Sequence, residues 1–176
     1  HRPPMSASCP VLKPALFAGR AYAVTGAAGL IGSAVCRRLV ELGAAVVAID
    51  IDADGLGRLA GRLRDAPGEL HPLVDDLCEQ DTIARAVSAC HDAAGHCAGW
   101  VNNAVWARHR PLDEQTEEDF VRMWRIGVLA AWRACRAVLP GMRAAGGGSI
   151  VNVSSVMAHG CTPDSSGYVS AKCALE

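Results

Sequence analysis

Three side chains near the end of the chain have the types and the spacing needed for proton transfer. Tyr168 and Lys172 are four residues apart, which places both on one face of a helix, and Ser155 precedes Tyr168 by thirteen residues. A phenol ionises at about pH 10, and an adjacent ammonium group favours the phenolate, which brings the pKa toward a useful range. A tyrosine in this setting can act as a general acid or base. Because a lone YxxxK pair is common by chance, its meaning depends on the elements that position it.

A glycine-rich segment near the start of the chain has the spacing of a phosphate-binding turn. The apolar run 21–24 leads into Thr25-Gly26-Ala27-Ala28-Gly29-Leu30-Ile31-Gly32, within which a helix is expected to begin. Such a turn lets backbone N–H groups approach a pyrophosphate, and the helix dipole favours its negative charge. Glycine spacing alone is weak evidence and a plain glycine turn is the alternative. The flanking strand and helix, with Asp50 about twenty residues further on, favour a dinucleotide site.

Asp50 also predicts which dinucleotide is bound. Its carboxylate could accept hydrogen bonds from both hydroxyls of an adenine ribose, whereas a 2′-phosphate would meet like charge. No basic residue stands beside it, because Ile51 follows directly. The sequence therefore predicts NAD, with NADP the less favoured cofactor. The alternative is that Asp50 serves only as a turn residue at the end of a strand.

From Arg20 onward, short apolar runs alternate with longer segments of helical period. This alternation predicts βαβ units and a doubly wound parallel α/β sheet, the Rossmann fold. Strands are expected at 21–24, 45–49, 70–74, 100–101 and 149–153, and helices at 30–42, 54–64, 82–94, 117–145 and from 166. Gly43 is placed to end the first helix and Thr116 to cap the long one. One domain is predicted over 17–176, after a disordered lead-in over 1–16.

The composition disfavours several classes of protein. Seventeen Lys and Arg against eighteen Asp and Glu leave a net charge of -1, so nucleic acid and anionic lipid find no basic field. No apolar stretch approaches the roughly twenty residues that span a bilayer. The eight cysteines stand singly, without a CxxC or a Cys/His metal spacing. We expect free thiols, no metal and a cytoplasmic location.

In this order the motifs resemble those of the short-chain dehydrogenase/reductase superfamily, over about Phe17 to Glu176. The resemblance is carried by the turn Thr25 to Gly32, Asp50, Asp76-Leu77, Asn102-Asn103-Ala104, Thr116 to Phe120, Ser154-Ser155 and Tyr168 to Lys172. It implies hydride transfer between NAD(H) and an alcohol or ketone. Tyr168 would be the catalytic acid/base, Lys172 would tune it and hold the nicotinamide ribose, and Ser155 would bond the substrate oxygen. The implied cofactor-binding residues are Thr25, Gly26, Gly29, Leu30, Ile31, Gly32, Asp50, Asp76, Leu77, Asn102, Ala104, Tyr168 and Lys172.

Three positions depart from the family pattern. The turn has the TGxxGxxG spacing of relatives that modify nucleotide sugars, which leaves such an activity as an alternative. Val105 stands where the family usually has glycine after Asn-Asn-Ala. Gly127 occupies the place of the usual catalytic asparagine in the long helix, so that either a water replaces the missing amide or turnover is slow. A catalytically impaired nucleotide-binding fragment is the second alternative.

The ends of the chain and one helix face complete the predictions. The chain begins at His1 and stops soon after Lys172, so five of the family's usual seven strands are expected, with the domain incomplete at its C-terminal side. Trp124 and Trp132 are eight residues apart, which puts them on one face of the helix expected over 117–145. In the family this helix pairs between subunits, so the resemblance implies a homo-oligomer.

Overall fold

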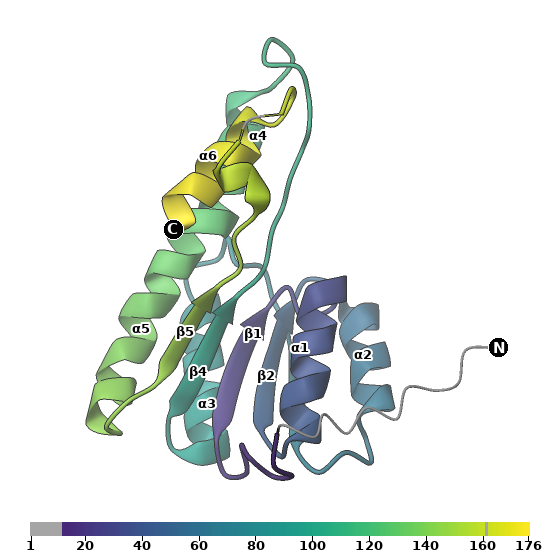
Figure 1. Cartoon of the computed structure of the whole chain (residues 1–176), viewed down its shortest axis with the longest axis vertical. Helices are drawn as coiled ribbons and strands as arrows, with labels where there is room; N and C mark the ends of the chain where they lie inside the picture. Colours follow the sequence, from purple (N-terminus) through teal and green to yellow (C-terminus); the bar gives the residue numbers. More distant parts are fainter. Residues whose placement is uncertain (1–11, 161) are drawn as a thin grey trace, which may run out of the picture.

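The computed structural model describes residues 12–160 and 162–176 and contains one five-stranded sheet (Figure 1). The strands are β1 (Ala21–Thr25), β2 (Ala45–Asp50), β3 (Glu69–Val74), β4 (Cys97–Asn102) and β5 (Ser149–Asn152). Their order is β3-β2-β1-β4-β5, and every pairing is parallel. From β1 the chain first adds β2 and β3 on one side and then β4 and β5 on the other. Open α/β sheets bind ligands at the point where the strand order reverses in this way. The predicted doubly wound α/β fold is confirmed.

The helices cover both faces of this sheet, which explains why its central strands are continuously apolar. They are α1 (Leu30–Glu41), α2 (Ala53–Arg62), α3 (Thr82–Ala94), α4 (Glu117–Trp124), α5 (Ala130–Ala144) and α6 (Ser166–Leu175). One core packs α1 and α2 against β1 and β2, around Val40 and Leu56. The other packs α3 and α5 around Trp100. Helices α4 and α6 lie beyond the carboxyl ends of the strands (Figure 1).

The two edges of the sheet differ from its centre. β3 contains Pro72, which has no N–H to donate and is tolerated because an edge strand leaves one side unpaired. β5 forms the other edge, and Val151 on it is 50% exposed.

The predicted helix ends are confirmed where a side chain or a glycine sets them. Gly43 has φ +90°, the left-handed conformation that follows the end of α1. The Thr116 hydroxyl accepts a hydrogen bond from the Asp119 N–H and caps α4. β4 is longer than expected, because Cys97 to Gly99 extend it at its start. Residues 1–11 of the predicted lead-in lie outside the described residues, and the Phe17 N–H already bonds the Leu42 carbonyl oxygen.

The single long helix predicted over 117–145 is interrupted. A turn of π-helix, Arg125–Leu129, separates α4 from α5 and has Gly127 at its centre. Glycine lowers the cost of departing from α-helical geometry, and π-turns are typical of functional sites. Within the described residues no helix is long and apolar enough to cross a membrane. The six described cysteines, Cys36, Cys78, Cys90, Cys97, Cys135 and Cys173, are all free thiols.

Candidate active site

The turn between β1 and α1 is shaped by glycines that cannot carry a side chain. Gly26 has φ +66°, and a Cβ there would lie 2.8 Å from the Cα of Ala104. A Cβ on Gly32 would collide with the carbonyl group of Gly26. α1 begins at Leu30, and its first intrahelical bond is donated by the Ser33 N–H to Gly29. The N–H groups of the first turn therefore remain available to an anion, beside the exposed side chains of Leu30 and Ile31.

The hydroxyl of Thr25 fixes this turn to the loop after β4. It donates to the Val101 carbonyl oxygen at 3.2 Å and accepts from the N–H groups of Asn103 and Ala104, both at 3.0 Å. The Asn103 amide donates to the carbonyl oxygens of Thr25 and Gly26 at 2.9 and 3.1 Å. A hydroxyl has one proton and two acceptor sites, so the capacity of Thr25 is used entirely within the protein.

Asp50 stands at the carboxyl end of β2 and braces the same turn. Its two carboxylate oxygens accept the N–H groups of Ala28 at 2.9 Å and Asp52 at 3.0 Å. Asp50 also lines a cleft of about 150 Å³ with Asp76 and Leu77 from the loop after β3. Gly26 and Ala104 line it too, so the cleft brings together five of the predicted cofactor-binding residues.

The loop that carries Asp76 and Leu77 is held by its neighbour Asp75. Burial alone would raise the pKa of Asp75, but hydrogen bonds from Arg85 and Thr82 outweigh it and lower that pKa. The Arg85 Nε lies 2.7 Å from the Asp75 carboxylate, and the buried Thr82 hydroxyl 2.9 Å from it. The Asp76 carboxylate accepts the Cys78 N–H at 2.8 Å. This loop is therefore fixed by charge-assisted bonds before any ligand arrives.

The predicted catalytic residues lie at the end of β5 and on α6. Lys172 Nζ is 5.9 Å from the centre of the Tyr168 ring and donates to the Val153 carbonyl oxygen at 2.6 Å. The Lys172 side chain is buried, and burial lowers its pKa. The Ser155 hydroxyl accepts the Met157 N–H at 3.2 Å, which leaves its own proton to be donated. The short 3-10 turn that Ser155 begins packs against α6.

His109, from outside the predicted motifs, lies against Tyr168. The rings of His109 and Tyr168 are centred 5.8 Å apart. His109 Nδ1 is 3.0 Å from the hydroxyl of Ser165, which is 4% exposed and precedes α6. His109 belongs to the loop between β4 and α4, and no spacing in the sequence links it to Tyr168.

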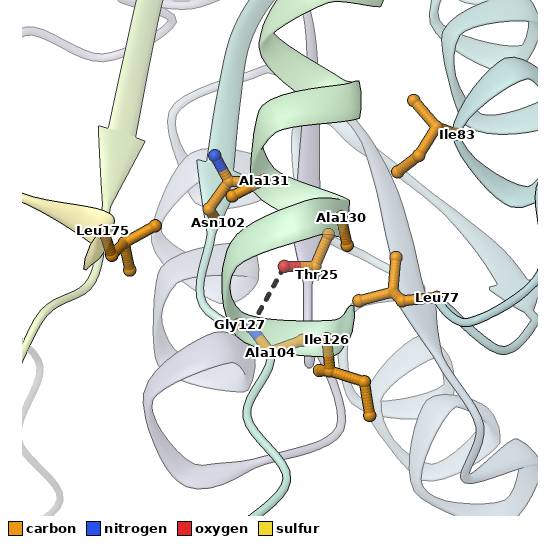
Figure 2. Close-up of a pocket in the computed structure, with 10 residues that line it drawn as sticks. All are labelled: Thr25, Leu77, Ile83, Asn102, Ala104, Ile126, Gly127, Ala130, Ala131 and Leu175. Carbon is orange, nitrogen blue, oxygen red and sulfur yellow. Dashed lines mark hydrogen bonds between the residues drawn. The ribbon is translucent and has the colours of Figure 1, made fainter. Parts of the chain in front are cut away.

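Gly127 faces a small cavity rather than a neighbouring side chain. The cavity, of about 10 Å³, lies between the π-turn and the ends of β1 and β4, and Thr25, Asn102 and Leu175 contribute to its wall (Figure 2). A Cβ on Gly127 would meet only the Cβ of Ala171, at an ordinary 3.5 Å. A cavity of this size is at the lower limit for one water molecule.

Asn102, like Thr25, uses its side chain within the protein. Its side chain is buried and accepts a bond from the Trp100 indole at 2.8 Å, while its amide donates to Asn152 at 2.8 Å. It therefore links β4 to β5. The neighbouring Asn103, which the sequence analysis quoted only as part of a motif, holds the glycine turn.

Comparison with known proteins places the chain in a family. A model of the short chain dehydrogenase family matches residues 20–176. The chain is 36% identical to the cis-4-hydroxycyclohexanecarboxylate dehydrogenase of Sinomonas cyclohexanicum, over 89% of this chain and 63% of that protein. It is 32% identical to the D-threitol dehydrogenase of Mycolicibacterium smegmatis, over 78% of this chain and 53% of that protein. The chain thus spans between half and two thirds of the length of these curated relatives.

Solved structures of oxidoreductases have the same fold as this chain. A metagenomic short-chain oxidoreductase in complex with NADP superposes with a TM-score of 0.85 at 31% identity, covering 90% of this chain and 72% of that one. NAD+-bound xylitol dehydrogenase superposes with a TM-score of 0.83 at 28% identity, covering 90% of this chain and 62% of that one. Fold, motifs and family model agree, and the chain belongs to the short-chain dehydrogenase/reductase family.

Proposed function

We propose that residues 17–176 bind NAD(H) and carry the proton-transfer residues of an oxidoreductase that acts on an alcohol or ketone. The observation that carries the proposal is the position of Tyr168 and Lys172 on α6. This helix lies beyond the carboxyl ends of the strands, at the same end of the sheet as the glycine turn between β1 and α1. The named relatives support the reaction class, since their names describe dehydrogenases. None of the relatives named above is described as acting on a nucleotide sugar.

The described residues fit a dinucleotide. The cradle at Gly26 and Gly32 admits backbone only, and the free N–H groups at the start of α1 suit a pyrophosphate. Asp50 would accept the adenine-ribose hydroxyls, and Asp76 and Leu77 would border the adenine. The carboxylates of Asp50 and Asp76 in one cleft support NAD over NADP, because they would repel a 2′-phosphate. Thr25 and Asn102 act as positioning residues in this proposal.

The cofactor would supply or accept the hydride, and this chain's residues would manage the proton. In the oxidation direction Tyr168 takes the proton of the substrate hydroxyl, and in reduction it returns one to the carbonyl oxygen. Lys172 places its ammonium group 5.9 Å from the centre of the Tyr168 ring. The Ser155 proton bonds the substrate oxygen and orients it toward Tyr168. Gly127 contributes no side chain, so proton exchange must proceed without an amide at that position.

The direct test is Tyr168→Phe, which removes only the hydroxyl. We expect NAD+-dependent oxidation of a panel of secondary alcohols to fall by about 10²–10⁴-fold, the usual contribution of a general acid or base. NADH affinity, followed by nicotinamide fluorescence, should fall far less than turnover, because the change removes only one hydroxyl group from the cofactor site. Tyr22→Phe is the matched control, because Tyr22 lies in β1 against Phe17. Full turnover by Tyr168→Phe would refute the assignment. NADH binding by the wild-type chain without any turnover would favour the impaired nucleotide-binding alternative.

We also infer a homo-oligomer that pairs through α4 and α5. Trp124 and Trp132 are 36% and 53% exposed and line one apolar groove with Phe120, Val128 and Leu129. An exposed apolar surface of this kind marks an interaction site. Trp132→Asp should shift the sedimentation coefficient to that of a smaller species, while Leu112→Asp, on an exposed loop residue, should not. An unchanged sedimentation coefficient for Trp132→Asp would contradict the pairing.

A further inference from the structure

The segment that leads into α6 lies against the loop between β4 and α4 (Figure 1). The Arg110 N–H donates to the Asp164 carbonyl oxygen at 3.0 Å. The Ser166 hydroxyl donates to the Gln115 amide oxygen. Asp164 has φ +65°, a conformation that is uncommon outside glycine and that persists only where surrounding contacts hold it. The start of the helix that carries Tyr168 is therefore held by a loop from another part of the chain.

The centre of this contact is the hydroxyl of Ser165, which is buried and fully hydrogen-bonded. It donates its one proton to the Pro163 carbonyl oxygen at 3.2 Å and accepts the Thr162 hydroxyl at 3.0 Å. Its other acceptor site faces His109 Nδ1, also at 3.0 Å. Because the hydroxyl has no second proton to give, His109 must be the donor, through a proton on Nδ1. The bond therefore fixes the orientation of an imidazole that is otherwise exposed.

The backbone of α6 is held separately, by α4. A Cβ on Gly167 would lie 2.4 Å from the terminal methyl carbon of Met123, so the two helices approach closely. The Trp124 indole N–H also donates to the Ser170 hydroxyl at 3.0 Å. These contacts determine where the helix lies. The direction of the phenol that it carries depends on the groups that contact the ring itself.

We propose that His109 is a positioning residue for Tyr168, an inference that rests on the function proposed above. The bond to Ser165 holds the imidazole, and the imidazole restricts the direction of the phenol. The two ring centres are 5.8 Å apart and their planes are inclined by 55°, an arrangement that is favourable for aromatic pairs. Proton transfer is sensitive to such placement, because a displacement of about 1 Å can cost ~100-fold in rate.

The first test needs no substrate, because the chain contains only two tyrosines, Tyr22 and Tyr168. Tyrosine labelled with 13C in the ring gives two sets of NMR signals, which Tyr22→Phe assigns. We expect His109→Ala to make the Tyr168 ring more mobile in 13C relaxation, while the Tyr22 ring is unaffected. His109→Phe, which keeps a flat ring but cannot bond Ser165, should increase the mobility less. His91→Ala, at an exposed histidine of α3, is the matched control and should change neither ring.

Turnover then separates positioning from a general loss of structure. His109→Ala should lower kcat by about 3- to 10-fold, the factor for loss of one hydrogen bond, and keep the NADH affinity. Added to Tyr168→Phe, the same change should cause no further loss, because the phenol that it orients has lost its hydroxyl.

Unchanged mobility of the Tyr168 ring in His109→Ala would overturn the proposal. An equal fall in turnover with and without the Tyr168 hydroxyl, or no fall in either, would overturn it as well. These results would leave the proposed function standing if Tyr168→Phe is itself impaired. Full turnover by Tyr168→Phe, together with a more mobile Tyr168 ring in His109→Ala, would instead refute the proposed proton transfer and keep His109 as the residue that orients this ring.

Discussion

The glycine turn after β1 and the π-turn between α4 and α5 use glycine for opposite reasons. At the glycine turn, a Cβ on Gly26 or Gly32 would strike backbone atoms, and Thr25 has no hydrogen-bonding capacity left. At the π-turn, Gly127 borders a cavity and a Cβ would meet only Ala171 at a normal distance. The first region is fixed by close packing of backbone, whereas the second has spare room. Substitutions in the glycine turn should therefore impair stability and cofactor binding far more than a substitution at Gly127 impairs stability.

The largest effect is expected for Gly32→Ala. The added Cβ would collide with the Gly26 carbonyl group, and backbone cannot move aside as a flexible side chain can. We expect a loss of about 3 kcal/mol in the free energy of unfolding, the upper part of the usual range for overpacking, together with loss of NADH binding. Urea denaturation measures the first and fluorescence the second. Gly57→Ala, where a Cβ meets nothing within 4 Å, is the control. Equal stability of the two variants would show that the turn is not sterically fixed.

Thr25→Val should have the next largest effect. Valine keeps the shape but removes the hydroxyl, which leaves the N–H groups of Asn103 and Ala104 without an acceptor. Each unsatisfied buried donor costs about 1–3 kcal/mol, so the free energy of unfolding measured with denaturant should fall by about 2–6 kcal/mol. Thr25→Ser keeps the hydroxyl and should retain most of the stability. If valine is tolerated as well as serine, the three bonds do not hold the turn to β4.

Lys172 should give a pH-dependent effect. Because burial lowers its pKa in the folded chain, the unfolded chain binds more protons between the folded pKa and the ordinary lysine value of about 10.4. The free energy of unfolding should therefore increase as pH rises from the folded pKa to the ordinary lysine value. It should decrease again as pH falls through the same window, and the decrease is complete below the folded pKa. Lys172→Met should abolish this contribution, whereas Lys13→Met, on an exposed residue, should not. Identical pH dependence for Lys172→Met and wild type would contradict the burial argument.

The smallest effect is expected for Gly127→Ala. Alanine is favoured over glycine inside a helix by about 1 kcal/mol, and the open space imposes no steric penalty. We expect the free energy of unfolding, measured with heat or urea, to increase by ~0.5–1 kcal/mol. The same substitution at Gly32 should decrease it. Gly127→Asn should also fold, and a rise in turnover would show that the missing amide limits the reaction. A destabilised Gly127→Ala would mean that the π-turn itself requires glycine.

The sequence predicts best what local chemistry determines. The strands, the Gly43 helix end and the Thr116 cap each depend on a few adjacent residues, and each is confirmed. The interrupted helix could not be predicted, because one glycine is compatible with both an α-helix and a π-turn. The full use of the Thr25 hydroxyl and the contact of His109 with Tyr168 arise from long-range packing. The spacing of residues in the sequence does not indicate which loop packs against which helix.

The proposed cofactor preference can be tested by titrating the wild-type chain and Asp50→Asn with NADH and NADPH. We expect the wild type to bind NADH more tightly, because the Asp50 carboxylate favours ribose hydroxyls and repels a 2′-phosphate. Asp50→Asn removes the charge and should narrow the difference between the two affinities. Equal or tighter binding of NADPH by the wild type would contradict the predicted cofactor. Binding of neither by a chain that is folded by circular dichroism would contradict the proposal that these residues form a cofactor site.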